Sequence, residues 1–252
     1  MIMDSWPNLN NPPVVAAIFQ LKYVAKELSI NSFLTLDSQI KNNLPHRSDN
    51  IHVGIDLGNS SIPLGVSSIH AKSDAKINSY VYSSEDKKTK LEITENSVTF
   101  IDESPYIGWS HFKESATKFF NILSEILNKT KIVRTSIRFI NRFSFEKFDS
   151  PEEYFNTLIS STNDGELPYP VQQYGFKIIM VVPNSNIHSI VNQNVEVVPP
   201  SPFNYTFDID VLDKDEYPFN IVIITEKSES LREIKNKIFF ENITQKTIDL
   251  CN

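Results

Sequence analysis

One stretch, residues 104 to 148, constrains the fold most, because the period of its apolar residues changes from that of a helix to that of a strand. As far as residue 127, apolar side chains recur every three or four residues, as on one side of an α-helix. From residue 132 the two faces alternate, as in a strand. The apolar side of the helix carries Trp109, Phe112, Ala116, Phe119, Phe120, Leu123, Ile126 and Leu127. A helix with several large aromatic residues needs a sheet to pack against, so the stretch predicts a helix lying on a sheet.

The strand of this stretch is predicted to place three arginines on one face, Arg134, Arg138 and Arg142. At ~3.3 Å per residue, neighbouring arginines are about 13 Å apart. One interpretation is a ladder that binds anions, because guanidinium groups match phosphate and carboxylate bidentately. The other interpretation is that the arginines pair with acids of an adjacent strand, for which Asp208 and Asp210 lie on one face of FDIDV. The second is favoured, since structural ion pairs commonly use arginines in this way.

The opposite face of the same strand carries one polar residue among apolar ones, Asn141. A buried amide is normally hydrogen-bonded, so we interpret Asn141 as a core amide rather than a catalytic group. The candidate ligand-binding residues are Arg134, Arg138, Asn141, Arg142, Asp208 and Asp210. The sequence gives no reason to assign a catalytic, cofactor-binding or metal-ligating residue.

Composition limits the classes of function. The chain has 252 residues and a formal net charge of −7, and this acidic balance argues against general nucleic-acid binding. Its single cysteine, Cys251, excludes a disulfide framework within the chain and a cysteine zinc site. The five histidines show no metal-ligand spacing, so we expect no metal and no cofactor.

Neither a leader sequence nor a membrane span is predicted. The N-terminus lacks a charged segment followed by an apolar one, and no apolar run reaches the ~20 residues needed to cross a bilayer. We therefore expect a cytoplasmic protein without membrane association.

The remaining pattern predicts an α+β fold with antiparallel sheets covered by long amphipathic helices. Short connections join the expected strands at 77–83, 89–94 and 97–102, which favours hairpins. Further strands are expected at 14–24, 51–56, 176–183, 190–198 and 205–213, with another possible strand at 219–225, and short helices at 31–44 and 150–159. A final helix is predicted to begin at a capping box, Ser230 to Glu233, and to bury Leu231, Ile234 and Ile238. Because strands followed by a long helix occur twice, the predicted domains are two lobes, 1–149 and 150–252, although no residue-level repeat shows a duplication.

The segment 53–61, VGIDLGNSS, is similar to the first phosphate loop of the actin, heat-shock-70 and sugar-kinase superfamily and of type III pantothenate kinases. In such a loop Asp56 would hold Mg²⁺ through water, and the amides near Gly58 would bind phosphate. Fifty residues precede the segment, and the sequence shows neither a second Asp-x-Gly loop nor a glycine-rich adenosine site. The kinase interpretation is therefore not adopted.

Four segments together resemble a family of uncharacterised, sporadically distributed prokaryotic proteins. They are residues 12–23, 91–112, 133–143 and 231–244, and the matching positions include Tyr106, Gly108, Trp109, Arg138, Asn141 and Arg142. The resemblance spans about residues 12 to 250, but Ala16 and Ala17 stand where the family has an acidic residue. A sporadic distribution implies mobile accessory genes, such as those for defence or toxin-antitoxin systems.

Three functions fit these observations. The first is a non-catalytic binding or sensor protein with a protein partner, a homo-oligomeric partner or a small anionic ligand. The second is an enzyme or binder that acts on a phosphorylated or nucleotide ligand through the arginine-lined face, with Asp208 or Asp210 as general base. The third is a structural subunit whose seventeen phenylalanines and nine tyrosines form an oligomer interface. The first is preferred, because no nucleophile or metal motif is present.

Overall fold

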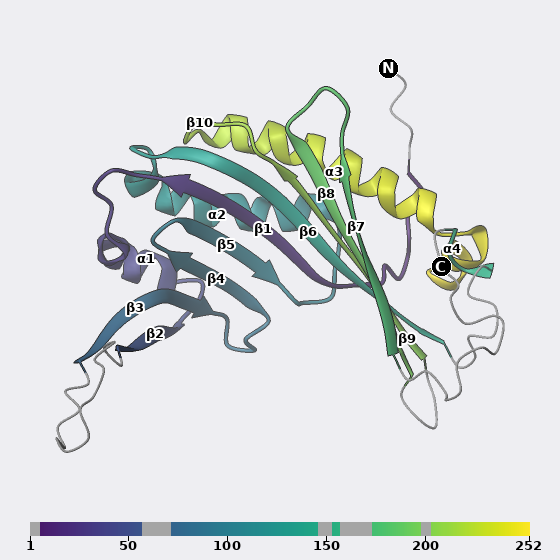
Figure 1. The fold of residues 1–252 in the computed structure, drawn as a ribbon, viewed down its shortest axis with the longest axis horizontal. Helices are drawn as coiled ribbons and strands as arrows, with labels where there is room; N and C mark the ends of the chain where they lie inside the picture. The colour runs from purple at the N-terminus through teal and green to yellow at the C-terminus, as the bar shows by residue number, and fades with distance from the viewer. Residues whose placement is uncertain (1–5, 57–71, 146–152, 157–172, 198–202) are drawn as a thin grey trace, which may run out of the picture.

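The computed structural model describes residues 6–56, 72–145, 153–156, 173–197 and 203–252, and its strands form one antiparallel sheet with helices on one face (Figure 1). The strand order is β2-β3-β4-β5-β1-β6-β9-β8-β7, and β10 pairs with β6. The strands are β1 (Val14–Val24), β2 (His46–Asp56), β3 (Lys72–Ser83), β4 (Thr89–Thr94), β5 (Ser97–Asp102), β6 (Lys131–Phe145), β7 (Gln173–Val181), β8 (Ile187–Val197), β9 (Phe203–Asp213) and β10 (Tyr217–Pro218). The helices are η1 (Ile30–Leu36, 3-10), α1 (Asp37–Lys41), α2 (Trp109–Leu127), α3 (Ile221–Asn242) and α4 (Gln245–Leu250). The α+β class expected from the sequence is confirmed.

The helix-covered face of the sheet holds the core. Phe19 of β1, Phe100 of β5 and Phe139 of β6 are almost fully buried beneath α2, and Phe207 of β9 lies against α3. Helix α2 contributes Phe112, Phe119 and Phe120 from the stripe that its sequence predicts. Fully burying one such side chain stabilises the fold by about 1.5–3 kcal/mol, so this layer dominates the stability.

The strand β6 lies at the centre of the sheet between β1 and β9. Its predicted alternation is confirmed from Thr135 to Phe143, where every second residue is buried under the helices. Ile132 differs from the prediction, which placed it on the arginine face. The register with β1 shifts between Lys22 and Tyr23, and this irregularity turns Ile132 into the core, where it is fully buried.

The two predicted lobes are not confirmed, because the sheet continues across the expected boundary at residue 150. Strand β6 ends at Phe145 and pairs along its length with β9, which begins at Phe203. The boundary itself and most of the helix expected at 150–159 lie outside the described residues, as do residues 57–61 of the phosphate-loop-like segment.

The last long helix begins earlier than predicted. Residues 221–225, expected in a possible strand, form the first turn of α3, because the Asn220 side chain accepts hydrogen bonds from the amides of Val222 and Ile223. Ser230 lies inside the helix, and its hydroxyl donates to the Glu226 carbonyl. The predicted capping box is therefore wrong, although its residues are helical.

Candidate functional site

The open face of the sheet, opposite the helices, carries a bidentate ion pair. Arg138 donates from Nε and Nη2 to the two carboxylate oxygens of Asp208, at 2.8 and 2.7 Å. Asp208 is buried, and Asn192 of β8 donates to it at 3.1 Å. Asp208 raises the pKa of Arg138 against the opposing effect of burial. The pairing of this arginine with a carboxylate of the adjacent strand, predicted from the sequence, is confirmed.

On the same face, Arg134 and Asp210 do not form a direct ion pair. Arg134 donates to the Gln20 side chain of β1, and its Nε is buried without a hydrogen-bond partner. Asp210 also has a buried oxygen, Oδ1, without a partner. Burial raises the pKa of Asp210, while the charges of Arg134 and Arg138 oppose that rise. Asp210 therefore stabilises the arginines at a distance and not through a direct hydrogen bond.

Arg142 lies apart from this cluster. It is exposed on β6 opposite Thr206, and its side chain forms no hydrogen bond or ion pair with any described residue. The three arginines thus have three different environments. Among the described residues a carboxylate binds only Arg138 of the three, and the row is not a uniform anion-binding ladder.

A shallow depression of about 700 Å³ lies beside the Arg138–Asp208 pair. Its other lining residues include Lys177, Asn192 and Asn194 from β7 and β8. Because the arginine and the carboxylate satisfy each other, a ligand here would meet mainly amide groups and Lys177.

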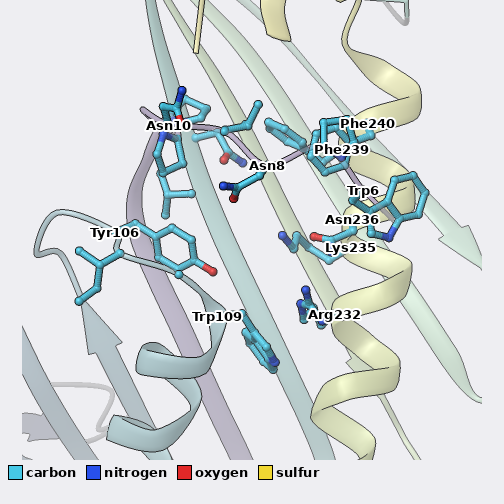
Figure 2. Close-up of a pocket in the computed structure, with 18 residues that line it drawn as sticks. Trp6, Asn8, Asn10, Tyr106, Trp109, Arg232, Lys235, Asn236, Phe239 and Phe240 are labelled. Carbon is cyan, nitrogen blue, oxygen red and sulfur yellow. The ribbon is translucent and has the colours of Figure 1, made fainter. Parts of the chain in front are cut away.

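The second region is a pocket of about 500 Å³ on the helix-covered side, which we call the α3 pocket. Figure 2 shows its walls: the N-terminal segment 6–14, the turn 106–109 before α2, and residues 232–240 of α3. Asn141 of β6 also lines it. Asn141 donates to the Phe207 carbonyl at 2.9 Å, which confirms the predicted core amide and places it against a cavity.

The charges of the α3 pocket are all positive. Arg232 and Lys235 project from α3, and no aspartate or glutamate is among the lining residues that the structure describes. Arg232 lies over Trp109 at 5.9 Å and forms ion pairs outside the lining with Glu233 at 3.3 Å and Glu229 at 3.6 Å. These two carboxylates lie close enough to offset part of the positive charge of Arg232.

Lys235 has no such partner. Its Nζ lies 4.4 Å from the centre of the Phe139 ring, and no described carboxylate is within ion-pair distance of it. Burial lowers the pKa of Lys235 to about 7, the positive charge of Arg232 adds to this effect, and Glu233 opposes it. The amine of Lys235 is therefore about half protonated near neutral pH.

Aromatic residues close the pocket at both ends. Trp6 stacks on Phe240 with ring centres 5.5 Å apart and donates from its indole to Glu233 at 3.0 Å. Tyr106 packs edge-on against Phe139, and burial raises its pKa to about 12. The Asn11 amide donates to the Cys251 carbonyl at 2.7 Å, which ties the N-terminal segment to the C-terminus. The pocket can thus hold a flat group between aromatic walls.

Sequence reasoning missed Arg232 and Lys235. It predicted that Leu231, Ile234 and Ile238 share the buried side of the helix, whereas Ile234 and Ile238 are only partly buried. The helix directs Leu231, Lys235 and Phe239 inward, at steps of four residues. The sequence does contain a signal for Lys235, because this lysine lies on the same side of the helix as buried apolar residues, where an apolar residue is normally found.

Comparisons with known proteins assign the chain to no family. The chain matches no protein-family model and no curated protein sequence. Within the described ranges, no cluster of three or more histidine, cysteine or acidic residues is arranged to hold a metal ion. None of the helices in those ranges combines the length and the apolar character that a membrane crossing needs.

Proposed function

We propose that this chain is a non-catalytic binding or sensor protein that recognises a small anionic ligand in the α3 pocket. The observation that carries the proposal is Lys235, a lysine that points into a cavity whose described lining includes no carboxylate. A buried cation is normally paired, and an anionic ligand would supply the missing partner. Arg232 adds a second positive charge at the same wall.

The ligand should combine its charge with a flat apolar part. Trp109, Tyr106 and Phe239 offer ring surfaces, while Asn141 and Asn236 offer amide groups for orientation. Pockets that bind small molecules typically have this composition, with apolar walls and a few convergent polar groups. An aromatic carboxylate or a mononucleotide fits this chemistry.

The alternative location, the arginine-lined sheet face, is less suitable for an anion. Asp208 already accepts from Nε and Nη2 of Arg138 with both of its oxygens, and Asp210 adds negative charge beside it. An anion there would have to displace a carboxylate held by two hydrogen bonds. An enzyme that clamps phosphate on this face is therefore the weaker hypothesis.

Thermal unfolding with paired ligands tests the proposal. We would compare adenosine 5′-monophosphate with adenosine, and benzoate with benzamide, since each pair differs mainly in charge. A ligand at 100 times its Kd stabilises the folded state by about 2.7 kcal/mol, which gives a clear shift in Tm. We expect an anion to raise Tm where its neutral counterpart does not.

A matched pair of variants locates the site. Lys235→Met should abolish the shift, whereas Lys237→Met should retain it, because Lys237 is exposed on the same helix. The proposal fails if the anions leave Tm unchanged, or if they shift wild type and Lys235→Met equally.

We further propose a role as an accessory component of a prokaryotic defence or toxin-antitoxin system, in which ligand binding is signalled to a protein partner. The support is the resemblance of residues 12–250 to a sporadically distributed prokaryotic family. Native mass spectrometry of the protein purified from its host, with and without phage infection, tests this role. A bare monomer in both preparations would contradict it.

A further inference from the structure

We propose that Lys235 captures its ligand covalently, as an imine, so that the ligand of the α3 pocket is a small aldehyde or ketone that also carries an anionic group. The requirement for an anionic group rests on the proposed function. The covalent capture rests on the amine itself and can be tested separately.

The position of the amine supports capture. Lys235 extends from α3 into the pocket toward Tyr106 and Trp109 (Figure 2). Its Nζ lies over Phe139 at 4.4 Å and is not engaged by a carboxylate of the described chain. Lys227 and Lys113 of the same protein differ, because Lys227 contacts Asp213 and Asp215 and Lys113 contacts Glu229. The carboxylates of Asp213 and Asp215 raise the pKa of Lys227 against the effect of burial, and a charged amine cannot attack a carbonyl group.

The electrostatic environment keeps Lys235 reactive at neutral pH. Desolvation beside an aromatic ring and a neighbouring cation are the two conditions that activate lysine amines toward carbonyl groups. Both are present here, since burial and Arg232 together lower the pKa of Lys235 to about 7. The contact with the Phe139 ring favours the charged form and opposes these effects only in part.

The reaction balances without any additional reactant. The lone pair of Nζ forms a bond to the carbonyl carbon, and a proton moves from nitrogen to oxygen to give a carbinolamine. Loss of that hydroxyl as water then forms the carbon–nitrogen double bond. No oxidant or reductant takes part, and hydrolysis reverses the capture.

Two further residues fit this chemistry. The hydroxyl of Tyr106 points into the pocket toward Lys235 (Figure 2), and burial raises its pKa to about 12, so it remains a proton donor for the departing water. Arg232 lines the same wall and can contribute to holding the anionic group of the ligand, although its ion pairs with Glu229 and Glu233 offset part of its attraction.

The first experiment uses pyridoxal 5′-phosphate as probe, because it joins an aldehyde, a flat ring and a phosphate. The protein is mixed with the probe at pH 7, the imine is reduced with borohydride, and modified lysines are located by peptide mass spectrometry. We expect trapping at Lys235 to be at least about tenfold faster than at Lys237, since an ordinary lysine has a pKa near 10.4 and is almost fully protonated at this pH. The rate at Lys235 should rise with a midpoint near pH 7.

Matched variants separate capture from charge. Lys235→Arg keeps the positive charge and cannot form an imine, so it should lose the adduct and still bind pyridoxine 5′-phosphate, which lacks the aldehyde. Lys235→Met should lose both properties. Lys237→Met should leave the adduct at Lys235 unchanged.

The outcomes distinguish the two proposals. If modification follows the exposure of the lysines and does not favour Lys235, covalent capture is overturned, even where pyridoxine 5′-phosphate binds. If pyridoxal without phosphate is trapped at Lys235 as fast as its phosphate ester, capture stands and the requirement for an anionic group is overturned.

Discussion

The two faces of the sheet differ in how their positively charged side chains are paired with carboxylates. On the open face, Arg138 is bound by both oxygens of Asp208, and Asp210 adds further negative charge nearby. On the helix-covered face, Lys235 lies over Phe139 with no described carboxylate in contact, beside a second cation, Arg232.

This difference distinguishes charged residues that stabilise the fold through ion pairs from charged residues that can bind a ligand. A paired arginine in a sheet ties two strands together, and its partner opposes the binding of an outside anion. A partly buried lysine with no carboxylate partner among the described residues lowers the stability of the folded protein, so its presence indicates a use. The more conspicuous row of arginines is therefore the structural region, and a single lysine on α3 marks the candidate site.

The largest effect is expected on the open face of the sheet, where the ion pair between Arg138 and Asp208 can be removed. Asp208→Ala should lower the free energy of unfolding by about 2–3 kcal/mol, because Arg138 loses its partner and Asn192 loses an acceptor. The side chain of Arg138 remains 42% exposed, so water limits the loss below that of a fully buried pair. Urea denaturation of Asp208→Ala, Arg138→Ala and the double variant measures the coupling. Additive effects of the single changes would show that the pair contributes nothing.

On the helix-covered face, removing the charge of Lys235 should instead increase the stability of the folded protein. Lys235→Met should raise the free energy of unfolding by about 1–2 kcal/mol at pH 6, because it removes a partly buried charge that contacts no described carboxylate. Lys237→Met, two residues further along α3 on its exposed side, should change it by less than about 0.5 kcal/mol. A loss of stability in Lys235→Met would indicate that the lysine is a structural residue.

The difference in stability between Lys235→Met and the wild type should also depend on pH. The folded pKa of Lys235, about 7, lies below its ordinary value of 10.5, so between these pH values the unfolded chain binds more protons. Stability of the wild type should therefore rise with pH through this window. The advantage of Lys235→Met should be greatest below pH 7 and disappear above about pH 10.5. Denaturation curves at pH 6, 8 and 10 test this, and a constant advantage would contradict it.

A smaller effect concerns Asp210, the unpaired acid of the open face. Because its folded pKa is raised above 3.8, the charged form is disfavoured, and Asp210→Asn should stabilise the protein at pH 7, by less than Lys235→Met. Below its unfolded pKa the carboxyl group is protonated in both states, so the gain should diminish as pH falls toward 4. Chemical denaturation at pH 7 and pH 4 gives the comparison. A destabilised Asp210→Asn at pH 7 would mean that its attraction to Arg134 and Arg138 outweighs burial.

The smallest effect is expected at Arg142. It is exposed and its side chain contacts no described partner by hydrogen bond or ion pair, so Arg142→Ala should change the free energy of unfolding by less than about 0.5 kcal/mol. Binding of anions in the α3 pocket should also be unaffected. A loss of binding in Arg142→Ala would return the arginine face to consideration as the ligand site.

Local patterns determined much of this fold. The period of the apolar residues predicted α2 and the alternation of β6, and short connections predicted the hairpins of β3, β4 and β5. Even the Arg138–Asp208 pair was foreseeable, because opposite charges on the same face of two strands tend to meet. The start of α3 was not foreseeable from β-branched residues alone, because the cap at Asn220 and packing on β9 outweigh their strand propensity.

Local patterns in the sequence predict most of the helices and strands and the face of β6 that carries the arginines, since these depend on residues close together in the chain. Only folding brings the strands of both halves into one sheet and places Trp6, Trp109, Asn141 and Lys235 around one cavity. Such contacts join residues that are far apart in the chain, Trp6 and Lys235 for example, and no local period encodes them. The absence of a described carboxylate beside Lys235 depends on all of its neighbours together, so it becomes visible only when the chain is folded.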